Sequence, residues 1–395
     1  MLCSPFPVLQ NTPIAFRMRG GMKAHKGSLR FAAMTAALLL GAAVPAHATL
    51  TVTNLVTDDQ AANPAQITDP SLVNAWGVSF APTGPFWVSD NGTGVSTLYS
   101  VDPATDATTK VGLTVTIPGD GSVTGQSFNA GFGGGSFNGN LFTFVSEDGT
   151  VSGWRFALGT AAEVLQPGSS ANVYKGSTSA IVAGHSYLYS ANFKTGKIDV
   201  MKGDATAPNL TGNFTDPALP AGYAPFNVQM LDGKIFVTYG LQNATGDEEV
   251  KGLGNGYVSE FDLNGNFIAR IGSAGTLNAP WGLAIAPSTF GANAGDLLVG
   301  NFGDGTINIF DLGADVFKGM LSDGHGNPIV IDGLWALTTG NDTLAGSSGR
   351  VYFSAGPGDE GHGLFGVIAD VPEPATLFVM GGALAAMALR RRKRA

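Results

Sequence analysis

The chain has 395 residues, 57 of them glycine, and a formal net charge of −9. Residues 1–48 and 371–395 together contain ten of the 21 lysines and arginines and only one of the 30 acidic residues. Residues 49–370 therefore hold 11 basic and 29 acidic residues and carry a net charge of −18. Such a surface repels phosphate backbones and anionic headgroups, which excludes nucleic acid as a partner of this part of the chain.

Residues 22–48 have the three regions of a secretory signal peptide. The basic residues Lys23, Lys26 and Arg30 come first, and an apolar run follows at residues 31–43. An Ala-x-Ala cleavage signal with Ala46 and Ala48 ends the segment. We expect the secretion machinery to export the chain and signal peptidase to cut it near Thr49. Residues 1–21 fit neither a signal nor a folded element, so Met22 is the expected true start, and the mature chain lacks Cys3 and any disulfide.

Residues 49–370 read as all-β, because glycines punctuate short runs of β-branched and aromatic residues and helical periodicity is nearly absent. Four segments align without gaps and share a glycine at the ninth position: 86–101, 141–156, 188–203 and 297–312. Each is expected to form a β-hairpin, with the glycine where the turn needs a positive φ. Looser copies at 234–265 and 350–368 make six hairpins.

A further strand is expected ahead of most hairpins, at 74–82, 225–231, 278–287 and 333–340. The repeat spacing of about 44 to 62 residues predicts a six-bladed β-propeller over residues 49–370. The arrangement resembles six-bladed propellers of the NHL-repeat type. The first mature strand, 50–56, has no hairpin partner, so we expect it to form the outermost strand of the last blade, 351–368, and to close the ring.

Three tryptophans, Trp76, Trp281 and Trp335, stand at the same place in three of these leading strands. Their repetition predicts packing between blades, and a sugar-stacking platform is the alternative.

Polar residues hold the fifth position of three aligned hairpins, where the strand enters the turn: Asp90, Asn192 and Asn301, with Val145 in the fourth hairpin. Hydrolytic propellers that this fold resembles hold Ca²⁺ or another divalent ion in such a ring, and oxygen ligands suit hard cations. Asp and Asn are also ordinary turn formers, and Val145 interrupts the ring. We therefore predict no metal and no cofactor, and keep these residues as the alternative metal ligands.

A second candidate site is the loop GPGDEGHGLFG, which places Asp359, Glu360 and His362 within four residues. Carboxylates beside an imidazole are groups from which a general base or a metal site is built. Glycines flank them, as in a surface turn, and the mature chain has neither a cysteine nor a G-x-S-x-G nucleophile elbow. We expect a chain without catalytic residues.

The C-terminus has three parts in succession. A glutamate between two prolines comes first, in the segment Val371, Pro372, Glu373 and Pro374. An apolar stretch, residues 375–389, follows, and the last part is a basic cluster of Arg390, Arg391, Arg392, Lys393 and Arg394. Fifteen residues form a helix of about 22 Å, which is short against a hydrocarbon core of roughly 30 Å. The basic cluster is expected to stay in the cytoplasm and to leave the propeller outside.

The order of these three parts resembles the PEP-CTERM sorting signal of Gram-negative bacteria that make exopolysaccharide. The resemblance implies that exosortase, a membrane-embedded protease, recognises Pro372, Glu373 and Pro374, while the apolar stretch and the basic cluster hold the chain transiently in the inner membrane. An ordinary single-span anchor is the alternative. The chain up to and including GLWALTTGNDTLAGSSGRVYFSAGPGDEGHGLFG, residues 333–366, also resembles a family of uncharacterised propeller proteins that often carry this tail.

The sequence therefore predicts an exported propeller, sorted to the cell surface or the extracellular polysaccharide matrix, that acts as a binding or structural module. Exopolysaccharide is the candidate partner. The alternative is a metal-dependent lactonase or esterase, because the same fold hosts both kinds of function.

Overall fold

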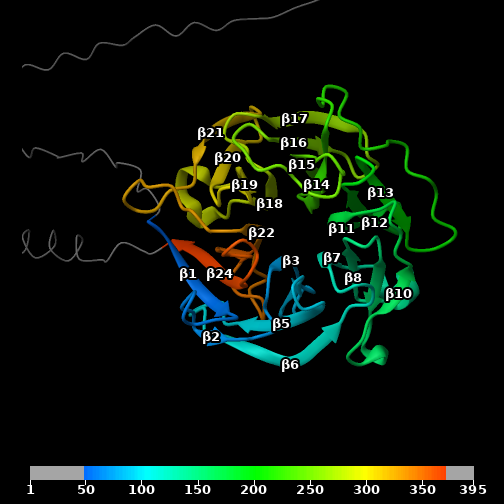
Figure 1. Cartoon of the computed structure of the whole chain (residues 1–395), viewed down its shortest axis with the longest axis horizontal. Helices are drawn as coiled ribbons and strands as arrows, with labels where there is room; N and C mark the ends of the chain where they lie inside the picture. The colour runs from blue at the N-terminus through cyan, green and yellow to red at the C-terminus, as the bar shows by residue number, and fades with distance from the viewer. Residues whose placement is uncertain (1–48, 371–395) are drawn as a thin grey trace, which may run out of the picture. The chain divides into compact units, whose positions relative to one another are not determined.

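The computed structural model describes residues 49–370, which form six antiparallel β-sheets around a central axis (Figure 1). The expected upstream segment, the signal peptide and the sorting tail lie outside the described residues. Within residues 49–370 no helix is long and apolar enough to cross a membrane. The predicted six-bladed propeller is confirmed.

The first three blades follow the chain from the axis outward. Blade 1 contains β3 (Ala75–Ser79), β4 (Phe86–Asp90), β5 (Val95–Val101) and β6 (Thr108–Thr116). Blade 2 contains β7 (Val123–Phe128), β8 (Phe142–Ser146), β9 (Val151–Trp154) and β10 (Glu163–Gln166). Blade 3 has three strands, β11 (Tyr174–Val182), β12 (His185–Asn192) and β13 (Lys197–Lys202).

The other three blades complete the ring. Blade 4 contains β14 (Tyr223–Leu231), β15 (Lys234–Leu241), β16 (Gly256–Phe261) and β17 (Phe267–Ser273). Blade 5 contains β18 (Pro280–Ile285), β19 (Leu297–Asn301), β20 (Ile307–Asp311) and β21 (Val316–Met320). Blade 6 contains β22 (Leu334–Thr339), β23 (Val351–Ala355), β24 (Leu364–Asp370), β1 (Leu50–Thr57) and β2 (Ile67–Thr68).

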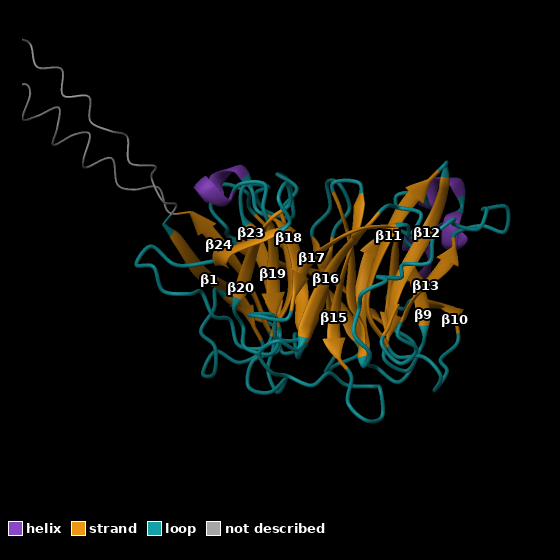
Figure 2. Cartoon of the chain, turned by 90° about the horizontal axis from the view of Figure 1, so that it is seen from above, coloured by secondary structure: helices purple, strands orange, loops and turns teal. Residues whose placement is uncertain are grey.

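The strands run between two faces that carry the loops (Figure 2). The helices of residues 49–370 are four short 3-10 segments in these loops: η1 (Phe132–Gly134), η2 (Ser136–Gly139), η3 (Phe156–Leu158) and η4 (Ser288–Asn293). All six predicted hairpins are present, as the second and third strands of each blade.

Ring closure is confirmed at blade 6. The N-terminal strand β1 pairs antiparallel with β24, from Leu50 opposite Asp370 to Thr57 opposite Leu364. The two-residue β2 pairs in parallel with the end of β1, so β1 is not quite the outermost strand that the sequence predicted. Because the first and last strands share a sheet, backbone hydrogen bonds join the two ends of the ring.

The hydrophobic core lies between neighbouring blades, because alternate residues of each strand face the next sheet. Between blades 6 and 1, for example, Phe86 packs against Tyr352 and Phe365, with ring centroids 4.7 and 5.1 Å apart. Buried clusters of the same kind join the other blades. These contacts fix the six inner strands around the axis.

Each inner strand has a bulge where its pairing with the second strand shifts register. A bulge leaves one residue out of the ladder and redirects its side chain. One residue from each of the six bulges is equivalent around the ring: Trp76, Thr124, Lys175, Phe226, Trp281 and Trp335. Four of the six are aromatic.

The aromatic residues of the bulges meet at the axis, and we call Trp76, Phe226, Trp281, Trp335 and the adjacent Phe302 the aromatic plug. Trp335 stacks on Trp76 at 3.6 Å and on Phe302 at 3.8 Å between ring centroids, and Trp281 meets Trp76 edge-on at 6.2 Å. All five rings are buried. The predicted packing role of the tryptophans is confirmed.

Candidate functional site

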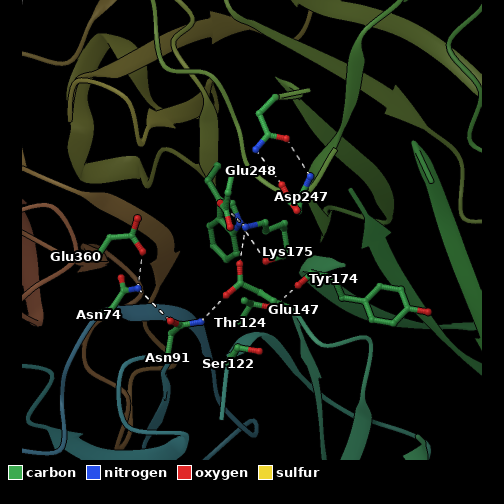
Figure 3. A network of polar contacts seen from close by, with 12 residues as sticks. Asn74, Asn91, Ser122, Thr124, Glu147, Tyr174, Lys175, Asp247, Glu248 and Glu360 are labelled. Carbon is green, nitrogen blue, oxygen red and sulfur yellow. Dashed lines mark hydrogen bonds and ion pairs between the residues drawn. The ribbon is translucent and has the colours of Figure 1, made fainter. Parts of the chain in front are cut away.

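Polar residues gather at one end of the channel, next to the plug (Figure 3). They come from five of the six blades: Asn74 and Asn91 from blade 1, Glu147 from the turn after β8, Lys175 from β11, Glu248 and Glu249 from the loop between β15 and β16, and Glu360 from the loop between β23 and β24. We call this group the acidic mouth. It holds four carboxyl groups and one ammonium group.

Lys175 is the centre of the acidic mouth. Its side chain is fully buried, and its Nζ lies 2.5 Å from Glu147 Oε1 and 2.9 Å from Glu248 Oε2. Burial alone would lower the pKa of Lys175, but the carboxylates of Glu147 and Glu248 outweigh burial and raise it. The side chain therefore remains an ammonium group, which orients the two carboxylates and is no amine nucleophile.

A chain of amide side chains extends from the ion pair through Asn91 and Asn74 to Glu360 (Figure 3). Asn91 Nδ2 donates to Glu147 Oε2 at 3.1 Å, and Asn74 Nδ2 donates to Asn91 Oδ1 at 3.2 Å and to Glu360 Oε2 at 2.6 Å. Trp335 Nε1 in turn donates to Asn74 Oδ1 at 3.0 Å. The carboxylates are thus held in place before any ligand binds.

Two carboxyl groups of the mouth bind protons more tightly than usual. Burial raises the pKa of Glu249 to about 7, although Lys175 partly opposes the shift. Burial also raises the pKa of Glu360, against the hydrogen bond from Asn74. Glu249 Oε2 is buried without a hydrogen-bond partner among residues 49–370. A carboxyl with a pKa near 7 is suited to exchange protons with a bound molecule.

The loop that was the second candidate site does not bring its three residues together. Glu360 belongs to the acidic mouth, whereas the Asp359 side chain is 96% exposed and lies 3.6 Å from Lys251. His362 Nδ1 lies 3.0 Å from Asp58 Oδ2. Asp359 and Glu360 both have positive φ, 55° and 65°, and the three side chains of this turn contact different partners.

The fifth-position residues do not form a ring at the channel mouth. Asn192 Nδ2 donates to Asp199 at 2.7 Å, and Asn301 Nδ2 donates to Thr306 Oγ1 at 3.1 Å within its own turn. Asp90 is fully buried in blade 1, and burial raises its pKa well above the usual range. Within residues 49–370 no group of three or more His, Cys, Asp or Glu side chains is placed to hold a metal ion.

The gap-free alignment also misplaced blade 2 by one residue. Strand pairing sets Ser146, not Val145, in the place of Asp90, because Val123 pairs with Ser146 as Ala75 pairs with Asp90. The turn of blade 2 is one residue shorter: Gly149 donates its backbone N–H to Ser146, three residues back, whereas Gly94 donates to a carbonyl four residues back.

With the corrected register, Glu147 is the equivalent of Asn91, and both belong to the acidic mouth. Glu147 could not be recognised from an alignment without a gap, and no sequence motif marks Lys175 or Glu248.

The C-terminal resemblance is confirmed: residues 370–393 match the family model of the PEP-CTERM protein-sorting motif. This motif implies processing by exosortase and sorting toward the cell surface.

Among solved structures, the chain is similar to an α-L-arabinofuranosidase of Fusarium graminearum in complex with an iminosugar inhibitor. The identity is 11%, the match covers 82% of this chain and 98% of that chain, and the TM-score is 0.51. At this identity the likeness shows the propeller fold alone.

Two relatives come from Acanthamoeba polyphaga mimivirus. The uncharacterized protein L690 is 29% identical over 312 residues, which cover 75% of this chain and 80% of the relative. The uncharacterized protein R648 is 30% identical over 296 residues, which cover 70% of each chain. On the strength of that match, the chain belongs to the family that includes R648, and in this member a PEP-CTERM motif occupies the C-terminus.

Proposed function

We propose that this protein is an exported binding module of the cell surface or the extracellular matrix, and that the acidic mouth is its ligand-binding site. Export is supported by the signal-peptide features of residues 22–48, with cleavage after Ala48 and a mature domain of residues 49–370. Sorting is supported by the PEP-CTERM motif, which implies exosortase as a partner. The observation that carries the proposal is the fixed pair of carboxylates on Lys175 at an accessible end of the channel.

The charge of the mouth favours an amine-bearing ligand. Four glutamates surround a single lysine, on a domain with a net charge of −18 from 11 basic and 29 acidic residues. The Glu248 side chain is 59% exposed, so a ligand reaches its carboxylate from solvent. A negative potential in a partly enclosed site attracts cations. The proposed ligand is an amino sugar, and the proposed source is the exopolysaccharide of the producing cell.

A hydrolase is the second candidate, because one observation favours it. Glu249, with a pKa of about 7, stands among other carboxyl groups at the mouth of the channel. Strongly shifted pKa values gather at catalytic sites, although structural ion pairs cause them too. The candidate reaction is hydrolysis of a lactone or an ester, with or without a divalent ion such as Ca²⁺.

The binding proposal is tested by titrating the purified domain, residues 49–370, with a glucosamine tetramer in an isothermal calorimeter. Glu248→Gln should weaken binding about tenfold, because one charge-assisted contact is worth roughly 1.4 kcal/mol. The matched control is Asp315→Asn, which neutralises an exposed carboxylate in the turn between β20 and β21 and should bind like the wild type. Equal affinity of Glu248→Gln and wild type, or no binding at all, contradicts the proposal.

A second assay distinguishes the binding function from the hydrolase function. Turnover of p-nitrophenyl esters or lactones, measured with and without added Ca²⁺, should be absent if the chain only binds. Turnover that Glu249→Gln abolishes would establish the hydrolase instead.

A further inference from the structure

Beyond the aromatic plug, the channel opens again on the opposite face as a cavity of about 280 Å³, which we call the far funnel. Each of the six inner strands contributes one or more residues to the wall of the far funnel, and these residues lie at the bulge of the strand or after it. Trp281 of the plug also lines the funnel. The plug therefore divides the channel into two separate sites.

The wall of the far funnel carries no charge. None of its lining residues is Asp, Glu, Lys, Arg or His, although the domain as a whole is strongly acidic. Hydroxyl and amide side chains supply the polar surface: Ser79, Ser127, Ser177, Thr178, Gln229 and Thr338. A wall of this kind offers hydrogen bonds to a neutral molecule and no counter-charge to an ion.

Two hydroxyl groups of the wall are buried without a partner. Ser177 is 8% exposed, and its Oγ has no hydrogen bond within residues 49–370; the same holds for the Oγ of Ser79 on blade 1. Neighbouring hydroxyls are occupied by the protein: Ser179 Oγ donates to the Phe128 carbonyl at 2.7 Å, and Thr178 Oγ1 accepts from the Met230 backbone at 3.2 Å. Buried polar groups are normally satisfied, so a bound molecule would supply what Ser79 and Ser177 lack.

We propose that the far funnel is a second binding site, for a neutral, hydroxyl-rich ligand of the size of one sugar ring. Its volume of about 280 Å³ is near the lower end of small-molecule pockets, which begin at roughly 300 Å³. The buried hydroxyls of Ser79 on blade 1 and Ser177 on blade 3 bind ligand hydroxyls, and the apolar wall, which includes Val78 and Leu337, receives the carbon face. The ligand is either a free monosaccharide or the end residue of a neutral glycan.

Titration of residues 49–370 with D-glucose, D-galactose, D-mannose and L-rhamnose, followed by saturation-transfer NMR, tests the proposal. At least one sugar should bind, and Ser177→Ala should weaken its binding at least fivefold. Thr338→Phe, at the funnel wall, should abolish binding by filling the cavity. A methyl glycoside and the corresponding free sugar distinguish a glycan end from a free monosaccharide.

Glu248→Gln serves as the control, because it changes the acidic mouth and leaves the far funnel untouched. It should bind the neutral sugar like the wild type, whereas binding of the glucosamine tetramer should weaken. The proposal for the acidic mouth and the proposal for the far funnel can therefore be contradicted independently of each other. The proposal is wrong if none of the four sugars binds at a ligand concentration on the order of 50 mM, which is high enough to detect weak, millimolar binding. It is also wrong if a sugar binds and neither Ser177→Ala nor Thr338→Phe changes its affinity.

Discussion

Six equivalent residues, one at the bulge of each inner strand, determine where the channel is closed by aromatic rings and where it is polar. Blades 4, 5, 6 and 1 supply Phe226, Trp281, Trp335 and Trp76, which close the channel. Blades 2 and 3 supply Thr124 and Lys175 instead. Lys175, from the polar pair, is the residue on which the carboxylates of the acidic mouth converge.

Glu249 makes the stability of the domain depend on pH. Its pKa is raised from 4.5 to about 7 by burial, so between these values the folded protein holds a proton that the unfolded chain has released. The free energy of unfolding should therefore fall as pH rises from 5 to 8, by at most about 3 kcal/mol. Glu249→Gln removes the titrating group and should remove this part of the decline.

Urea unfolding at pH 5 and pH 8 measures the effect as the difference between wild type and Glu249→Gln. Asp359→Asn is the control for loss of one exposed charge and should follow the wild type. If Glu249→Gln loses as much stability as the wild type over this range, Glu249 does not carry the raised pKa.

The sequence contained a weak signal for Lys175. Tyr174-Lys175-Gly176 has the same form as Ala75-Trp76-Gly77 and Pro280-Trp281-Gly282, in which the middle residue is the bulged one. A lysine in place of a tryptophan breaks the similarity of residue type, so the equivalence becomes clear only from strand pairing. The partners of Lys175 come from distant loops, and no local pattern predicts which loops meet.

Strands were predicted well where local chemistry specifies them. The six hairpins have alternating apolar residues and, in four of them, a shared glycine, so their sequence alone determined strand, turn and strand. The inner strands β7 and β11 were missed, because VTGQSF and YKGSTSAIV are mostly polar or small and line the funnel rather than the core. Blade 3 has three strands, and the sequence did not predict that it would lack a fourth. The stretch between β13 and β14 is rich in turn residues, and such a stretch does not by itself indicate that a strand is absent.

Closure of the ring by β1 should account for a large share of the stability. Leu50, Leu55 and Val56 of β1 are buried, and burial of each side chain is worth roughly 1.5–3 kcal/mol. Removing residues 49–57 should lower the melting temperature by about 10 °C or more. Calorimetry of domains 49–370 and 58–370 provides the comparison.

A pair of point variants checks the same contact without truncation. Leu55→Ala should cost about 2–5 kcal/mol, whereas Thr53→Ala, on the exposed side of the same strand, should cost little. Equal melting temperatures for the full and the shortened domain would mean that β1 does not close the ring.

At the scale of the whole molecule, the propeller and the two ends of the chain have separate tasks. Residues 49–370 hold 29 acidic and 11 basic residues, whereas the other 10 basic residues lie in the two end segments, which are predicted to direct export and sorting. The sorting motif was evident from sequence, because its three parts are contiguous. The acidic mouth and the far funnel were not evident from sequence, because they assemble from five and six blades.

The sorting motif predicts a specific change in the mature protein. In a host that expresses exosortase, the wild-type protein should lose Arg390, Arg391, Arg392, Lys393 and Arg394 and leave the inner membrane. Replacing Pro372, Glu373 and Pro374 by Ala should leave a full-length chain in that membrane, because the apolar stretch and the basic residues still insert.

Mass spectrometry of the C-terminus of the mature protein, purified from its native host, tests most directly whether this propeller works outside the cell. The expected result is a wild-type chain that ends before Arg390 and a triple-alanine chain that ends at Ala395. A wild-type chain that retains Arg390 to Arg394 in the presence of exosortase would contradict it, since an ordinary anchor would then hold the propeller at the inner membrane.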